Sequence, residues 1–101
     1  MFNLKYKAFQ VAGAETKHKY GSSFKFDVSE VPDWAWKTTF TDKSGHTETQ
    51  LSYSDNGDSD SFWVGRNKYY ICLKPTYWVV LDPLTQKLWA FSDEQFKEIF
   101  E

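Results

Sequence analysis

The sequence predicts a strand-rich α+β domain: an antiparallel β-meander, forming a twisted sheet or a partly closed barrel, with one short C-terminal α-helix. Three observations predict this class. Apolar and polar residues alternate with a period of two along most of the chain, as in strands with one buried face. The segments between them are short and rich in glycine, proline and aspartate, which favour turns. Only residues 92–101 place several large apolar side chains at helical spacing.

The N-terminal third is expected to contain two strands. Residues 2–8 alternate apolar and polar side chains, and residues 24–28 repeat the pattern after a break at Gly21-Ser22. Between these strands the period is lost, and the small residues at 11–15 suggest a short helix.

The middle of the chain is expected to form a β-hairpin. Residues 34–40 alternate, with Trp34 and Trp36 on one face. The loop at residues 42–45 ends in a glycine, which can adopt the positive φ that hairpin turns need. The returning strand at residues 46–54 is mostly polar, so we expect it at an edge or on a solvated face.

Short strands follow a polar loop at residues 55–60, and their short connections favour a meander. We expect them at residues 62–64, 69–73, 77–81 and 87–91. The strands at 69–73 and 77–81 are almost continuously apolar, which indicates that both faces are covered and that they form the centre of the fold.

The last element is predicted to be a helix that begins after Ser92. The Ser92 hydroxyl can cap it, and Gln95, three residues later, completes a capping-box pattern. Phe96, Ile99 and Phe100 fall at positions i, i+3 and i+4, which gives one apolar stripe to lie on the sheet.

The length and composition indicate a single domain spanning residues 1–101. The chain holds one cysteine, Cys72, so it forms no internal disulfide, as is usual in a reducing compartment. Its start alternates instead of forming the apolar run of a signal peptide, and its longest apolar run, 77–81, is far shorter than the roughly 20 residues that cross a bilayer. We therefore expect a cytoplasmic protein with no membrane partner.

No catalytic or metal-binding motif stands out. A nucleophilic site needs a serine or cysteine beside a histidine base, and Cys72 is expected inside a buried strand. His46 and Glu48 share a strand face, but together with His18 they lack the spacing of a metal site. We therefore expect no cofactor and no enzymatic activity. A metal-dependent nuclease or hydrolase is an alternative, although the Glu-Thr-Lys tripeptide at 15–17 lacks the preceding aspartate of such sites.

A second alternative is a module that binds single-stranded nucleic acid through the N-terminal strands. Residues 2–26 contain several aromatic residues interspersed with five lysines. These lysines are Lys5, Lys7, Lys17, Lys19 and Lys25. Stacking on bases requires aromatic and basic side chains on the same face of a sheet. Here the two kinds alternate and therefore point to opposite faces, which favours a buried aromatic face with solvated lysines.

The leading hypothesis is a small inhibitor or adaptor that binds another protein and acts by occlusion. Immunity proteins and phage-encoded blockers of a host or toxin enzyme are molecules of this type. Five tryptophans and six tyrosines exceed what 101 residues readily bury, and exposed aromatic residues are typical of binding hot spots. The candidate anchors are Trp34, Trp36 and Trp63. An acidic rim of Asp55, Asp58 and Asp60 would meet a basic partner, for example a nuclease or toxin.

Overall fold

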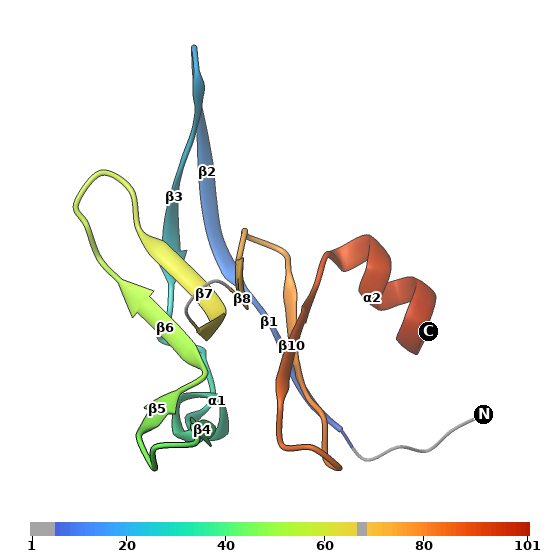
Figure 1. The fold of residues 1–101 in the computed structure, drawn as a ribbon. Coiled ribbons are helices and arrows are strands. Elements are labelled where there is room, and N and C mark those ends of the chain that lie inside the picture. The colour runs from blue at the N-terminus through green and yellow to red at the C-terminus, as the bar shows by residue number, and fades with distance from the viewer. Residues whose placement is uncertain (1–5, 67–68) are drawn as a thin grey trace.

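The computed structural model describes residues 6–66 and 69–101 (Figure 1). In chain order the elements are β1 (Lys7–Gln10), β2 (Ala12–His18), β3 (Gly21–Asp27), α1 (Asp33–Lys37), β4 (Thr39–Thr41), β5 (Thr47–Thr49), β6 (Leu51–Ser54), β7 (Ser61–Arg66), β8 (Tyr69–Cys72), β9 (Trp78–Leu81), β10 (Leu88–Phe91) and α2 (Asp93–Phe100). The strands form small antiparallel sheets with the orders β1-β9-β10, β2-β3, β4-β5 and β6-β7-β8. The predicted class, strand-rich and antiparallel with a short C-terminal helix, is confirmed. The strand expected at residues 2–8 falls mostly outside the described residues.

The capping box predicted for α2 is present. The Gln95 N–H donates to the Ser92 hydroxyl at 3.1 Å, and the Ser92 N–H donates to the Gln95 side-chain oxygen at 3.0 Å. Phe96 is buried and stacks on Trp78, with the ring centroids 4.1 Å apart, which fixes the helix to the β1-β9-β10 sheet. The predicted stripe is wrong at Ile99, which is 59% exposed, because the helix meets the sheet through Phe96 and through Phe100, whose ring packs on Phe91 with the centroids 5.6 Å apart.

The β2–β3 hairpin projects from the rest of the molecule as an arm (Figure 1). The helix predicted at 11–15 is wrong, since Ala12 to His18 pair with β3 and every residue of β2 is exposed. Gly13 lies opposite Phe26, where an added Cβ would collide with the carbonyl oxygen of Lys25. Long-range pairing therefore overrides the weak local helix preference of small residues.

The strand predicted at residues 34–40 is wrong in its first part, where α1 ends at Lys37, and is present only from Thr39, where β4 begins. Pro32 occupies the N-cap position of α1, and Ala35, between the two tryptophans, is fully buried. The Thr38 hydroxyl donates to the carbonyl oxygen of Trp34 at 2.7 Å and closes the last turn. The spacing of two between Trp34 and Trp36 does not distinguish a strand from a helix here. In a single helical turn these two positions lie on either side of the intervening residue, so both tryptophans flank the face on which Ala35 is buried.

The chain forms a meander through β6, β7 and β8, but β9 then leaves that sheet and pairs with β1 and β10. Strand β9 is central and mostly buried, as predicted. The same prediction is wrong for residues 69–73, because β8 is an edge strand whose four residues are all exposed. Cys72 is therefore an exposed free thiol and not the buried residue expected from its apolar neighbours.

The core gathers side chains from several sheets and from α1. Its buried members are Val11, Phe26, Ala35, Leu51, Phe62, Val64, Leu73, Val79, Leu81 and Leu88. Gln50, itself buried, joins two parts of the molecule: its side-chain amide donates to the carbonyl oxygens of Thr39 and Gln86 at 3.0 and 2.9 Å, and its side-chain oxygen accepts the Leu88 N–H at 2.7 Å. This residue also interrupts the strand predicted at 46–54, which the structure divides into β5 and β6.

Within the described residues, no helix is long and apolar enough to traverse a lipid bilayer.

Candidate functional site

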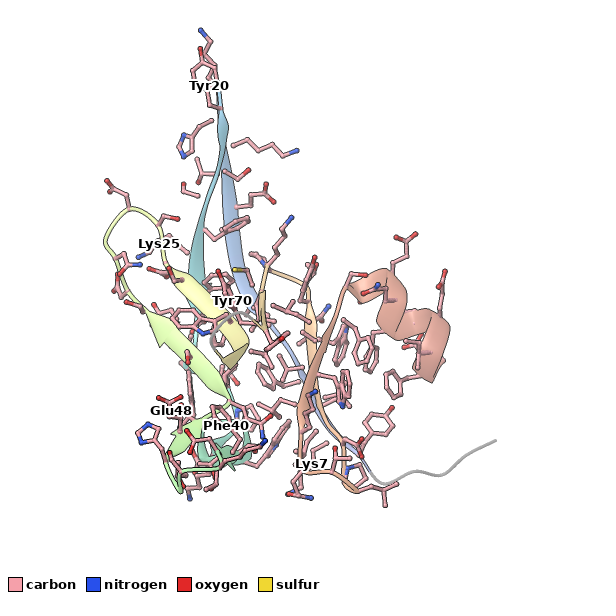
Figure 2. All side chains as sticks on the ribbon, viewed as in Figure 1. Lys7, Tyr20, Lys25, Phe40, Glu48 and Tyr70 are labelled. Atoms are coloured by element: carbon pink, nitrogen blue, oxygen red, sulfur yellow. The ribbon has the colours of Figure 1, made fainter. Side chains whose placement is uncertain are left out.

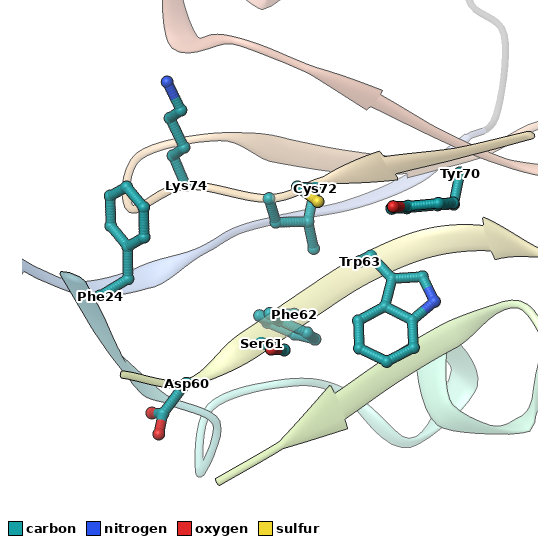
Figure 3. A pocket seen from close by; sticks show the side chains of 9 residues that line it. Phe24, Asp60, Ser61, Phe62, Trp63, Tyr70, Cys72 and Lys74 are labelled. Atoms are coloured by element: carbon teal, nitrogen blue, oxygen red, sulfur yellow. The ribbon is translucent and has the colours of Figure 1, made fainter. Parts of the chain in front are cut away.

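The most distinctive surface lies on the outer side of β7 and β8. Phe62 and Val64 point inward and are 3% and 4% exposed, so the intervening Trp63 points to the opposite face of β7. There its ring makes an edge contact with the ring of Tyr70, the centroids being 6.4 Å apart. Cys72 pairs with Trp63 in the strand register and lies beside them (Figure 3). We call Trp63, Tyr70 and Cys72 together the β7–β8 surface.

The β7–β8 surface opens into a hollow of about 490 Å³. Phe24 from the arm and Lys74, just after β8, line it together with the three residues of the surface (Figure 3). The hollow is largely apolar, with an ammonium group at its margin. This volume lies within the range of about 300–1,000 Å³ that is typical of ligand pockets in proteins.

Strand β8 is exposed on both faces. Tyr69, Tyr70 and Ile71 are 80%, 50% and 48% exposed, although they are consecutive apolar or aromatic residues. Tyr70 shares the outer face with Trp63, while Tyr69 and Ile71 point to the other side. Natural proteins usually protect edge strands with charge or with covering segments, so this uncovered aromatic edge is the candidate contact surface.

Gly65 positions β8 against β7. It has a φ of +108°, which side chains rarely adopt, and an added Cβ would collide with the carbonyl oxygen of Tyr69. The glycine therefore permits both the bend and the close approach of the two strands. Any side chain at this position must displace the β8 backbone and with it Tyr69 and Tyr70.

Of the three aspartates expected to form an acidic rim, Asp60 is buried, whereas Asp55 and Asp58 are exposed. The side chain of Asp60 is fully buried, and it accepts hydrogen bonds from the Lys25 ammonium at 2.8 Å, the Phe26 N–H at 3.0 Å and the Tyr53 hydroxyl at 3.0 Å. The hydrogen bond from Lys25 is the main cause that lowers the pKa of Asp60 to about 2. Asp55, whose side chain is 64% exposed, also contacts the same ammonium group, at 3.2 Å, and Asp58 is exposed outside this ion pair.

This cluster is a structural clamp. Lys25 lies at the base of the arm (Figure 2), and its ammonium also donates to the carbonyl oxygen of Gly57 at 2.8 Å. The Asp60 N–H donates to the carbonyl oxygen of Phe24 at 2.7 Å. Together these bonds tie the 55–60 loop to β3, next to the hollow, and hold the wall formed by Phe24 in place.

The tryptophans predicted as anchors lie in different environments. Trp34 and Trp36 are half-buried against the core, where Trp34 meets the ring of Phe9 and Trp36 stacks on Phe62. Because Phe62 and Trp63 point to opposite faces of β7, Trp36 and Trp63 do not share a surface. Of the predicted anchors, Trp63 alone belongs to the β7–β8 surface.

Sequence reasoning missed Tyr69, Tyr70 and Ile71, which it placed in the core. One signal was present: two adjacent tyrosines carry hydroxyl groups that need water or a hydrogen-bond partner, which is unusual in a strand covered on both faces. Phe24 and Lys74 were also missed, because their place beside the surface depends on contacts between distant strands.

The two histidines lie in different segments, His18 at the end of β2 and His46 just before β5. The ring of His18, on the arm, contacts the Ser23 hydroxyl at 2.8 Å, and the ring of His46 contacts the Glu48 carboxylate at 3.1 Å. In the part of the chain that the structure describes, no three histidine, cysteine, aspartate or glutamate side chains gather as they would around a metal ion. No protein-family model, curated protein or solved structure matches the chain.

Proposed function

We propose that this chain is a protein-binding domain without catalytic activity, an inhibitor or adaptor that acts by covering a surface of its partner. The observation that carries the proposal is the exposure of Tyr69, Tyr70 and Ile71 on an edge strand beside Trp63. Clusters of exposed tryptophan and tyrosine contribute most of the binding energy in many protein interfaces. Immunity proteins and phage-encoded blockers of enzymes illustrate the class.

The scaffold beneath the surface supports this proposal. Phe62, directly under it, packs against the rings of Phe26, Tyr53 and Trp36, with centroid distances of 5.2, 5.6 and 6.1 Å. Strand β7 is thereby fixed from below, and Gly65 fixes the approach of β8. A surface that is already ordered loses little conformational entropy on binding, which favours affinity.

The aromatic surface does not indicate whether the partner is acidic or basic. A basic nuclease or toxin was expected from the loop aspartates, but the Lys25 ammonium neutralises one of the two charges of Asp55 and Asp60, and Asp60 is buried. The proposal of a protein partner therefore rests on the aromatic residues, and Asp58 contributes at most to steering. We expect its replacement to change the association rate and its salt dependence more than the dissociation rate.

The test begins with affinity capture from a native lysate, followed by a binding measurement with the purified captured protein. We expect Trp63→Ala and Tyr70→Ala each to weaken binding by about 30-fold, as for hot-spot residues. Leu84→Ala is the matched control, because Leu84 is 87% exposed and lies in the turn before β10, away from this surface. Wild-type affinity in both aromatic variants would refute the proposal.

A second candidate function, binding of single-stranded nucleic acid, is favoured by the tip of the arm. Tyr20 is 91% exposed at the end of the arm (Figure 2), and the Lys19 ammonium lies 5.3 Å from the centre of its ring. Here a lysine and an aromatic ring lie together, unlike the alternating residues of the strands. Filter binding with mixed oligonucleotides tests this candidate: retention at low salt that Tyr20→Ala reduces would support it, and no retention would remove it.

A further inference from the structure

The backbone of β8 alternates between groups that bond to β7 and groups that do not. The Leu73 N–H donates to the carbonyl oxygen of Phe62 at 2.8 Å, which identifies this pair as hydrogen-bonded. On the other side of β7, the Gly65 N–H donates to the carbonyl oxygen of Gln50 at 2.8 Å. In an antiparallel ladder, successive residues direct their N–H and C=O groups to opposite edges. Ile71 therefore bonds toward β7, like Leu73.

It follows that the N–H and C=O groups of Tyr70 and Cys72 point away from β7. Strand β8 has β7 as its neighbour on one edge, and among the described residues no strand pairs with the other edge. Two donors and two acceptors thus lie along an open edge in the spacing that an extended backbone complements.

Each face of β8 also borders a hollow. On the outer face, Tyr70 and Cys72 line the hollow of about 490 Å³ described above. On the opposite face, Tyr69 lines a second hollow of about 440 Å³ together with Leu88 and Lys87. Successive side chains of a strand added to β8 would enter these two hollows alternately, because their directions alternate with a period of two.

The charge of nearby lysines indicates which kind of segment could pair with this edge. Lys74 lies directly beyond the end of β8. Lys87 lines the hollow beside Tyr69, and its ammonium group lies 4.5 Å from the centre of the Trp89 ring. Lysines beside an open edge oppose pairing between two copies of the same chain, since the like charges meet. They attract an extended segment whose ends are acidic.

We propose that the free edge of β8 binds an apolar, extended segment of a partner protein, flanked by acidic residues, through β-strand addition. The inference rests on the proposed function and names the kind of segment that the partner supplies. The backbone N–H and C=O groups of Tyr70 and Cys72 bind the backbone of the segment and provide the affinity. The two hollows accommodate its alternate side chains and provide the specificity.

The first test uses a synthetic peptide with blocked ends, a core of alternating valine and threonine, and acidic residues on both sides. Binding to the wild-type chain is followed by calorimetry and by intrinsic tryptophan fluorescence, and the change in fluorescence is compared between the wild type and Trp63→Phe. We expect saturable binding, about tenfold weaker when the central amides of the peptide are N-methylated, because each methyl group removes a backbone donor. A peptide with lysine flanks should bind at least about fivefold more weakly.

The matched protein variants are Cys72→Pro and Cys72→Ser. Proline at this position removes the outward N–H of β8 but no hydrogen bond to β7, whereas serine keeps that N–H. We expect about tenfold weaker peptide binding in Cys72→Pro and near wild-type binding in Cys72→Ser. Because N-methylation changes only the peptide, it remains decisive if Cys72→Pro is poorly folded.

Any one of four outcomes would overturn the proposal. One is no binding of the acidic peptide to the wild-type chain at about 1 mM. Another is equal affinity for the N-methylated peptide. The third is self-association of the wild-type chain in sedimentation experiments that Cys72→Pro abolishes, which would assign the edge to a second copy. If a captured partner loses binding with Trp63→Ala but not with Cys72→Pro, strand addition fails while the proposed function stands.

Discussion

Replacing Phe62 or its neighbour Trp63 by alanine separates packing from contact on a single strand. Phe62 is 3% exposed and touches three aromatic rings, from β3, α1 and β6. Truncation of such a buried phenylalanine costs about 3–5 kcal/mol. Trp63 is half-buried on the outer face of β7 and contacts Tyr70, and losing one partly exposed ring pair costs about 1 kcal/mol. The two variants should therefore differ by about 2–4 kcal/mol in the free energy of unfolding.

Thermal and urea unfolding, followed by far-UV circular dichroism, measure this difference. For a domain of this size about 1 kcal/mol lowers the Tm by 4–8 °C, so Phe62→Ala should melt at least about 12 °C below the wild type. A domain of about 100 residues has a stability of roughly 5–15 kcal/mol, so Phe62→Ala retains only part of it. Trp63→Ala should melt within about 8 °C of the wild type and lose partner binding. Equal destabilisation by both substitutions would show that Trp63 is a core residue and would refute the reasoning.

Three further predictions concern the elements around this surface. The pKa of Asp60 is lowered to about 2 from its ordinary value of 3.8, so the ionised carboxylate contributes its full stabilisation above about pH 4 and loses it as the pH falls through 2. The difference in Tm between the wild type and Asp60→Asn should therefore shrink over that range of pH. A constant difference in Tm would contradict the clamp. Gly65→Ala should destabilise the fold by about 1–3 kcal/mol and weaken binding, because it displaces β8; wild-type behaviour in urea unfolding and in binding would show that the glycine is not required. Ser92→Ala should cost about 1 kcal/mol and reduce helical circular dichroism, while Ser92→Thr, which keeps the hydroxyl cap, should not.

Local signals predicted the parts of the fold that depend on neighbouring residues. The capping box of Ser92 and Gln95 lies within one helical turn, and the structure contains it as predicted. The turn at residues 42–45 depends on Gly45, which has a φ of +87°. At both places the physical cause is contained in a few consecutive residues, so the sequence pattern is sufficient.

The errors occur where distant segments decide the outcome. Apolar composition indicated the same burial for the strands at 69–73 and 77–81, but β1 pairs with β9 and leaves β8 at an edge. In the sequence Asp60 has the pattern of a solvated loop carboxylate, because its partner Lys25 belongs to the distant strand β3. Trp63 was identified as a candidate anchor, whereas the exposure of Tyr70 depends on which strand lies at the edge, and a single sequence carries little information on that order.

The most direct test of the account measures amide hydrogen exchange along β8 by NMR, first in the free chain and then with the captured partner. In the free chain the N–H groups of Ile71 and Leu73 should exchange slowly, because they bond to β7, and those of Tyr70 and Cys72 should exchange quickly. Addition of the partner should slow the exchange of Tyr70 and Cys72. Slow exchange of all these amides in the free chain, or unchanged fast exchange of Tyr70 and Cys72 in the complex, would contradict an open strand edge that serves as a binding site.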